Sequence, residues 1–94
     1  MNILFIHQSF PGQYRHILKA LSDQGVHSLV GLGISECYEP LPQGVTYLRY
    51  PIGRGNTQGI HECLLDIDSK LIRAESCATA ARNLKEKGFN PDLI

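Results

Sequence analysis

The segment from His7 to Gln13, HQSFPGQ, contains the residue types that could do chemistry. It follows an apolar run, so His7 stands where a buried strand would end. A glycine in a turn between a strand and a helix lets backbone N–H groups approach an anion, and the dipole of the helix favours the negative charge. Phosphate contact at Gly12 is therefore one interpretation of this segment. The other is a plain turn that packs Phe10 under the sheet.

Neither the glycine pattern nor the histidines identify a known type of site. The segment carries one glycine, so it matches neither GxGxxG nor the GxxxxGK[ST] pattern of P-loops. His7 could face a crevice or be a hydrogen-bonded structural residue, and His61 could reach a ligand or cap a helix. The four histidines show no metal-ligand spacing with carboxylates or cysteines, so we expect no metal and no cofactor held by this chain.

The composition is that of one small globular domain. Of the 94 residues, 43% are hydrophobic and 19% charged, without a low-complexity run. Nine basic residues balance nine acidic ones, so no long-range field attracts nucleic acid, and no nucleic-acid partner is expected. The three cysteines form no CxxC pair, which favours reduced thiols in the cytoplasm. The apolar run at the amino terminus is too short to span a membrane.

Three apolar runs predict the strands that position these loops. They cover residues 2–7, 26–32 and 45–50, and a further run begins at Leu93. Strands that alternate with helices make a parallel sheet whose ligand-binding loops gather at the carboxyl edge. The predicted fold class is α/β, a partial Rossmann-like parallel sheet in the order β-α-β-β-α-β. Residues 1–94 are expected to form an incomplete domain, because the last strand is entered and not completed.

Two helices are predicted between the strands. The first ends at Gly25, and its apolar stripe consists of Tyr14, Ile17, Leu18 and Leu21. The second covers residues 60–87, and its seam consists of Ile60, Leu64, Ile67, Leu71, Ala74, Ala78 and Ala81. The alanines favour close packing of this seam on a sheet, while a heptad seam also allows pairing with another chain.

The sequence resembles the start of bacterial family 4 glycosyltransferases. MNILFIHQSFPGQYRHILKAL is similar to the subgroup whose amino-terminal domain begins with a strand, a histidine and an FPGQ-type turn. The similarity continues through VTYLRY, the loop around GNTQGIHE, the alanine-rich helix and GFNPDLI, and so covers essentially the whole chain. The resemblance implies the amino-terminal portion of a GT-B fold, in which two Rossmann-like domains face each other across a cleft. The amino-terminal domain mainly shapes the acceptor side, and the carboxyl-terminal domain holds most of the nucleotide-sugar.

The same resemblance implies roles for individual residues. It suggests that Gly12 lets the backbone approach the phosphates of the donor, that His7 supports the loop, and that His61 lies near the acceptor side. The residues that it places in or beside the cleft are His7, Phe10, Pro11, Gly12, Gln13 and His61. It assigns no catalytic residue to this part of the fold.

The implied function is transfer of a sugar from a nucleotide-sugar to a hydroxyl of an acceptor glycan or lipid-linked sugar by the full-length protein. Both substrates must be positioned and the leaving phosphate stabilised, so we expect the 94-residue chain alone to be inactive. The expected location is cytoplasmic, with peripheral attachment to the inner membrane left open. The alternative is a non-catalytic α/β binding or interaction domain that uses the long helix 60–87. Exposed sheet edges would favour self-association.

Overall fold

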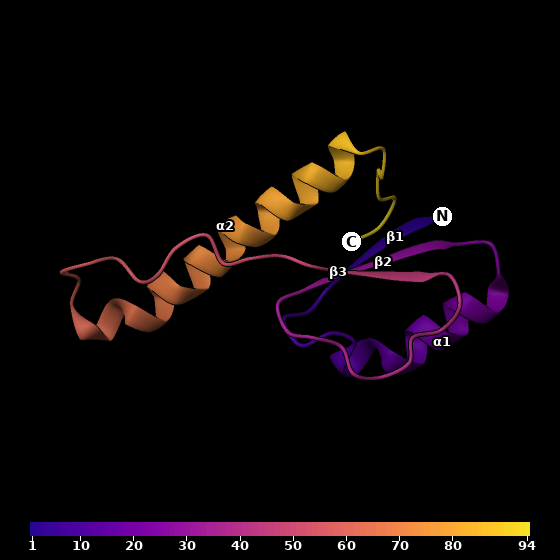
Figure 1. Cartoon of the computed structure of the whole chain (residues 1–94), viewed down its shortest axis with the longest axis horizontal. Coiled ribbons are helices and arrows are strands. Elements are labelled where there is room, and N and C mark those ends of the chain that lie inside the picture. The colour runs from indigo at the N-terminus through magenta and orange to yellow at the C-terminus, as the bar shows by residue number, and fades with distance from the viewer.

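The computed structural model describes residues 1–94 and contains a three-stranded parallel sheet in the order β1-β2-β3 (Figure 1). The strands are β1 (Asn2–Ile6), β2 (Ser28–Gly33) and β3 (Val45–Arg49). Leu93 forms a parallel bridge with Ile3 on the free side of β1. After β3 the chain therefore crosses over and returns beside β1. The predicted α/β class with a partial Rossmann-like sheet is confirmed.

The first crossover contains the helix α1 (Arg15–Gln24), which follows a 3-10 turn at Gly12–Tyr14. α1 ends at Gly25, whose φ of 68° is left-handed and whose N–H donates to the Ser22 carbonyl oxygen at 3.0 Å. The predicted helix stop at this glycine is confirmed.

The second crossover contains the long helix α2 (Leu65–Glu86), which follows a 3-10 turn at Glu62–Leu64. The sequence predicted a helix from residue 60, and the structure begins it later because His61 has an extended backbone and caps the 3-10 turn. In Figure 1 the first half of α2 and the loop before it project beyond the sheet. We call residues 51–71 the arm.

β1 and β2 are buried on both faces, as their continuous apolar runs predict, whereas β3 has no buried residue. Successive side chains of a strand point to opposite faces, so Ile3 and Phe5 pack on the α1 side while Leu4 packs on the α2 side. Leu18 of α1 is completely buried in the first cluster. Ile17, which the predicted stripe also included, is 51% exposed and does not belong to this core.

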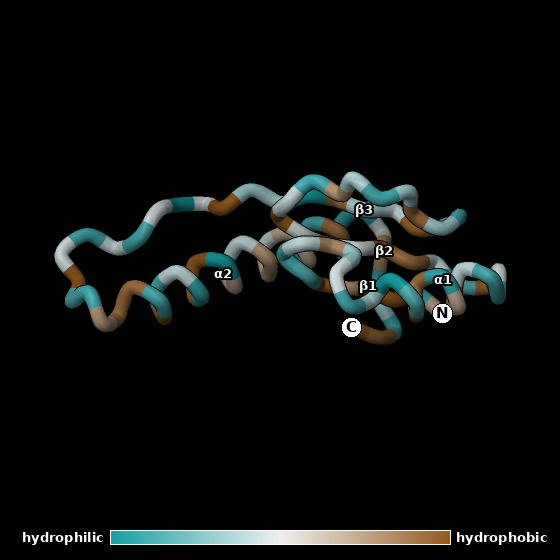
Figure 2. Tube along the Cα trace, turned by 90° about the horizontal axis from the view of Figure 1, so that it is seen from below, coloured by the Kyte–Doolittle hydropathy of each residue, from teal (hydrophilic) through white to brown (hydrophobic).

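The predicted packing of the α2 seam on the sheet is wrong. The side of α2 that packs on the second cluster consists of Cys77, Ala80, Ala81 and Leu84, and only Ala81 belongs to the predicted seam. Leu64, Ile67 and Leu71 are between 51% and 60% exposed, and Figure 2 shows hydrophobic residues in the part of α2 beyond the sheet. α2 carries apolar residues on more than one of its sides, so their spacing alone could not select the side that meets the sheet.

The close approach of Phe10 to Gly31 gives a test of the fold. A Cβ at Gly31 would lie 2.4 Å from the Phe10 ring, so Gly31→Ala should destabilise the protein by about 1–3 kcal/mol. Denaturant unfolding measures this difference. Gly55→Ala is the matched control, because no heavy atom lies within 4 Å of a Cβ there. Equal stability of the two variants would contradict the packing described.

Candidate functional site

The carboxyl edge of the parallel sheet is the place where an α/β fold binds its ligands, especially where the strand order reverses. Leu93 lies beside β1 and β2 lies on its other side, so the chain reverses its direction across the sheet at β1. The loop after β1, which we call the first loop (residues 7–13), follows this strand directly. The structure thus places the first loop at the switch point of the sheet.

His7 begins the first loop and is fixed by two hydrogen bonds. Its backbone N–H donates to the Leu32 carbonyl oxygen at 3.0 Å, and its Nδ1 accepts the Ser9 backbone N–H at 3.0 Å. An accepting Nδ1 places the proton of the neutral ring on Nε2. The ring also meets the edge of Tyr14, with centroids 6.0 Å apart. His7 therefore holds the loop against the start of the following helical turn.

Position 12 requires a glycine because the His7 ring leaves no room for a side chain there. A Cβ at this position would lie 2.5 Å from two ring atoms of His7, and its φ of 50° lies in the left-handed region. The small size of Gly12 is thus used for packing within the loop. Gln13 beside it is exposed. Contact of Gly12 with a phosphate and the position of Gln13 at the cleft remain predictions.

Phe10 and Pro11 support the first loop from within the protein. Phe10 is 2% exposed and stacks on Tyr47, with ring centroids 4.9 Å apart and 9° between the planes. Gly31 in β2 leaves the room for this ring. The side chain of Phe10 is therefore not available to a ligand, and Pro11 is also buried. These two residues shape the loop and leave its polar neighbours exposed.

His61 is not brought together with the first loop. It is exposed and lies in the arm, where its Nδ1 accepts the Cys63 backbone N–H at 3.1 Å. This is the helix-capping arrangement that the sequence offered as one of two interpretations. A contact with an acceptor remains a prediction.

Sequence reasoning missed a contact between the first loop and α2. The Arg73 Nη1 donates to the Gln8 Oε1 at 2.8 Å, although the two residues are far apart in sequence. The Gln8 backbone carbonyl oxygen also accepts the N–H groups of Ile34 and Ser35, both at 3.0 Å. Gln8 thus joins the first loop, the loop after β2 and α2. No spacing signal marks this pair, because it depends on where α2 crosses the carboxyl edge.

Asp68, in the first part of α2, forms hydrogen bonds with the loop that precedes this helix. Its carboxylate accepts the Thr57 backbone N–H at 2.7 Å, the Thr57 hydroxyl at 2.8 Å and the Asn56 side-chain N–H at 3.1 Å. The backbone hydrogen bond from Thr57, followed by its hydroxyl, holds the pKa of Asp68 below its usual value. The arm is therefore held by exposed polar contacts.

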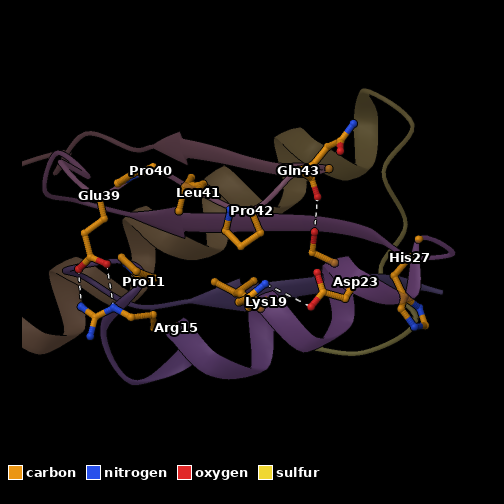
Figure 3. A pocket seen from close by; sticks show the side chains of 14 residues that line it. Pro11, Arg15, Lys19, Asp23, His27, Glu39, Pro40, Leu41, Pro42 and Gln43 are labelled. Carbon is orange, nitrogen blue, oxygen red and sulfur yellow. Dashed lines mark hydrogen bonds and ion pairs between the residues drawn. The ribbon is translucent and has the colours of Figure 1, made fainter.

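A groove of about 810 Å³ runs between α1 and the segment 39–44 (Figure 3). The charged residues that line it form two ion pairs. Arg15 Nε donates to a carboxylate oxygen of Glu39 at 2.7 Å, and Lys19 Nζ lies 3.3 Å from a carboxylate oxygen of Asp23. The hydrogen bond from Arg15 lowers the pKa of Glu39. The groove is separate from the carboxyl-edge contacts of Gln8, and its cations already have partners.

Residues 25–94 match the family described as the Glycosyl transferase family 4 group. The chain belongs to this family. Searches of curated proteins and of solved structures gave no match. The family match begins after α1, so the role of the first loop in this glycosyltransferase-family chain rests on its geometry.

Two further properties of the family 4 chain bear on its chemistry. No group of three or more His, Cys, Asp or Glu side chains is arranged to hold a metal ion. None of its helices combines the length and the apolar character needed to cross a membrane.

The contact between Gly12 and His7 predicts a coupled pair of substitutions. Gly12→Ala should destabilise the chain more than Gly25→Ala, because both positions have positive φ but only position 12 lacks space. We expect about 1 kcal/mol for Gly25→Ala and about 1–3 kcal/mol more for Gly12→Ala. In the His7→Ala background the extra cost should disappear. Additive effects in denaturant unfolding would contradict the contact.

The lowered pKa of Asp68 predicts a pH dependence of the arm. Its folded pKa lies below its unfolded pKa, so its stabilising contribution is present above the unfolded pKa. This contribution should be lost as pH falls through the folded pKa. The Thr57 amide resonance in NMR should report that titration below the usual aspartate range. Asp68→Asn is the control and should abolish it; an unchanged Thr57 titration would exclude the contact.

Proposed function

We propose that this chain is the amino-terminal portion of a nucleotide-sugar-dependent glycosyltransferase that transfers a sugar to an acceptor hydroxyl. Membership of the family 4 group supports the reaction class. The observation that carries the proposal is the first loop, which lies at the switch point of a parallel sheet and is fixed there by His7 and Gly12. A loop held in this way can present backbone and polar side chains to a ligand without reorganising.

We propose further that residues 1–94 are an incomplete GT-B amino-terminal domain and are inactive alone. The bridge between Leu93 and Ile3 supports this, because it starts a fourth strand beside β1. The exposed apolar residues of the arm also lack a partner within the chain. Transfer requires donor, acceptor and leaving group to be held together, and one sheet edge offers contacts to only part of them.

The partners in this proposal are a nucleotide-sugar donor and an acceptor that is a glycan or a lipid-linked sugar. We propose a cytoplasmic location, peripheral to the inner membrane where the acceptor is lipid-linked. Free thiols at Cys37, Cys63 and Cys77 support a reducing compartment.

The alternative is a non-catalytic domain that binds another chain through α2, and the exposed Leu64, Ile67 and Leu71 favour it. The two functions differ in one measurement. Catalysis predicts sugar transfer by the longer protein that contains this chain, whereas the alternative predicts none. Self-association through sheet edges or the α2 seam remains a prediction under either function.

The decisive test begins with the coding sequence beyond Ile94. We expect the reading frame to continue through the rest of this domain and a second βα-repeat domain. Its full product should transfer sugar from a nucleotide-sugar in a radiolabel assay, and the 94-residue chain should not. A stop codon directly after Ile94 would contradict catalysis, and robust transfer by the 94-residue chain would contradict the need for a second domain.

A further inference from the structure

Arg73 differs from the other arginines of the chain in its burial. It is half-buried, whereas the other four are exposed: Arg15, Arg49, Arg54 and Arg82. Its Nε donates to the Ser69 carbonyl oxygen at 3.3 Å and its Nη1 to Gln8 at 2.8 Å. These contacts use two of the five N–H donors of a guanidinium. A cation is thus held in a fixed orientation at the carboxyl edge of the sheet.

No carboxylate neutralises Arg73. The four ion pairs of the structure have other cations, which are Arg15, Lys19, Arg49 and Lys70. Arg73 is the smallest of the contributions that lower the pKa of Asp66, and this carboxylate is already paired with Lys70 at 2.8 Å. A partly desolvated guanidinium that lacks an anion is a strong candidate to bind one, since charge-assisted hydrogen bonds are stronger than neutral ones.

Gln8 adds donors to the same place. Its side-chain oxygen accepts from Arg73, which orients the amide, and its two side-chain N–H groups are available as donors. The backbone carbonyl of Gln8 is fixed by two N–H groups of the loop after β2. Arg73 and Gln8 therefore present free N–H donors from α2 and from the first loop. Several N–H donors beside one positive charge suit an oxyanion.

We propose that Arg73 and Gln8 bind a phosphate group of a substrate at the switch point of the sheet. The planar guanidinium can donate to two phosphate oxygens, and the Gln8 amide can donate to a third. The identity of the phosphate rests on the proposed function. It belongs either to the diphosphate of the donor or to a phosphorylated acceptor, and both sources have the same recognition chemistry.

A purely structural role is the competing explanation, because Arg73 could serve only to hold Gln8. Gln8→Glu separates the two. A carboxylate at position 8 still accepts from Arg73, so the clamp between loop and helix should persist and thermal unfolding should be unchanged or occur at higher temperature. The same carboxylate removes the amide donors and neutralises the guanidinium. Phosphate binding should therefore fall while stability does not.

The experiment is an NMR titration of the isotope-labelled 94-residue chain that follows the side-chain N–H signals of Gln8 and Arg73. The probes are uridine diphosphate, glucose 6-phosphate and uncharged glucose. We expect a phosphorylated probe to shift these signals and glucose to leave them unchanged. A response to the diphosphate indicates the donor as the source, and a response to the sugar phosphate indicates a phosphorylated acceptor.

Matched variants complete the test. Arg73→Gln and Gln8→Glu should each weaken binding of the responding probe by about tenfold or more. Arg82→Gln should not, because Arg82 is an exposed arginine on the same helix without an ion pair. Thermal unfolding confirms that each variant is folded. No response to either phosphorylated probe, or unchanged binding by Arg73→Gln and Gln8→Glu, would overturn the site. The transferase assay of the longer protein tests the proposed function independently.

Discussion

The arrangement of the carboxyl edge depends on the absence of a side chain at Gly31. The Phe10 ring occupies the space where a Cβ would lie, stacks on Tyr47 and thereby fixes the first loop to the sheet. Because Phe10 is anchored, the backbone on either side of it is positioned as well. His7 then packs under Gly12, and Gln8 reaches both the neighbouring loop and α2. One close contact in the core thus controls where the polar residues of the site stand.

The sequence was sufficient for the strands and for the class of fold. Continuous apolar runs are typical of strands covered on both faces, and the two core clusters on opposite faces of β1 show why the pattern is informative. The stop at Gly25 was equally readable, since glycine is favoured where the backbone is left-handed. The alternative that Phe10 packs under the sheet was also present in the sequence interpretation. Its partner Gly31 could not be assigned, because their contact joins separate elements.

The remainder of the site depends on tertiary geometry that spacing does not contain. α2 has apolar residues on more than one side, so its sequence was compatible with several orientations on the sheet. The second core cluster meets Cys77 and Leu84 of α2, and this orientation leaves Leu71 exposed and directs Arg73 toward the first loop. The error in the predicted seam and the missed cation therefore have the same cause. Rotation of a helix about its axis changes both the packed face and the residue that reaches the site.

Composition alone does not show which charged side chains are already paired and which are free to contact a ligand. Equal numbers of acidic and basic residues exclude a long-range field, but short-range recognition depends on which charges are paired. Arg15 and Lys19 form ion pairs on the α1 side, whereas Arg73 at the switch point forms none. Burial strengthens an electrostatic contact there relative to one in bulk water. The proposed phosphate site agrees with this neutral composition, because a polyanion would require an extended basic surface.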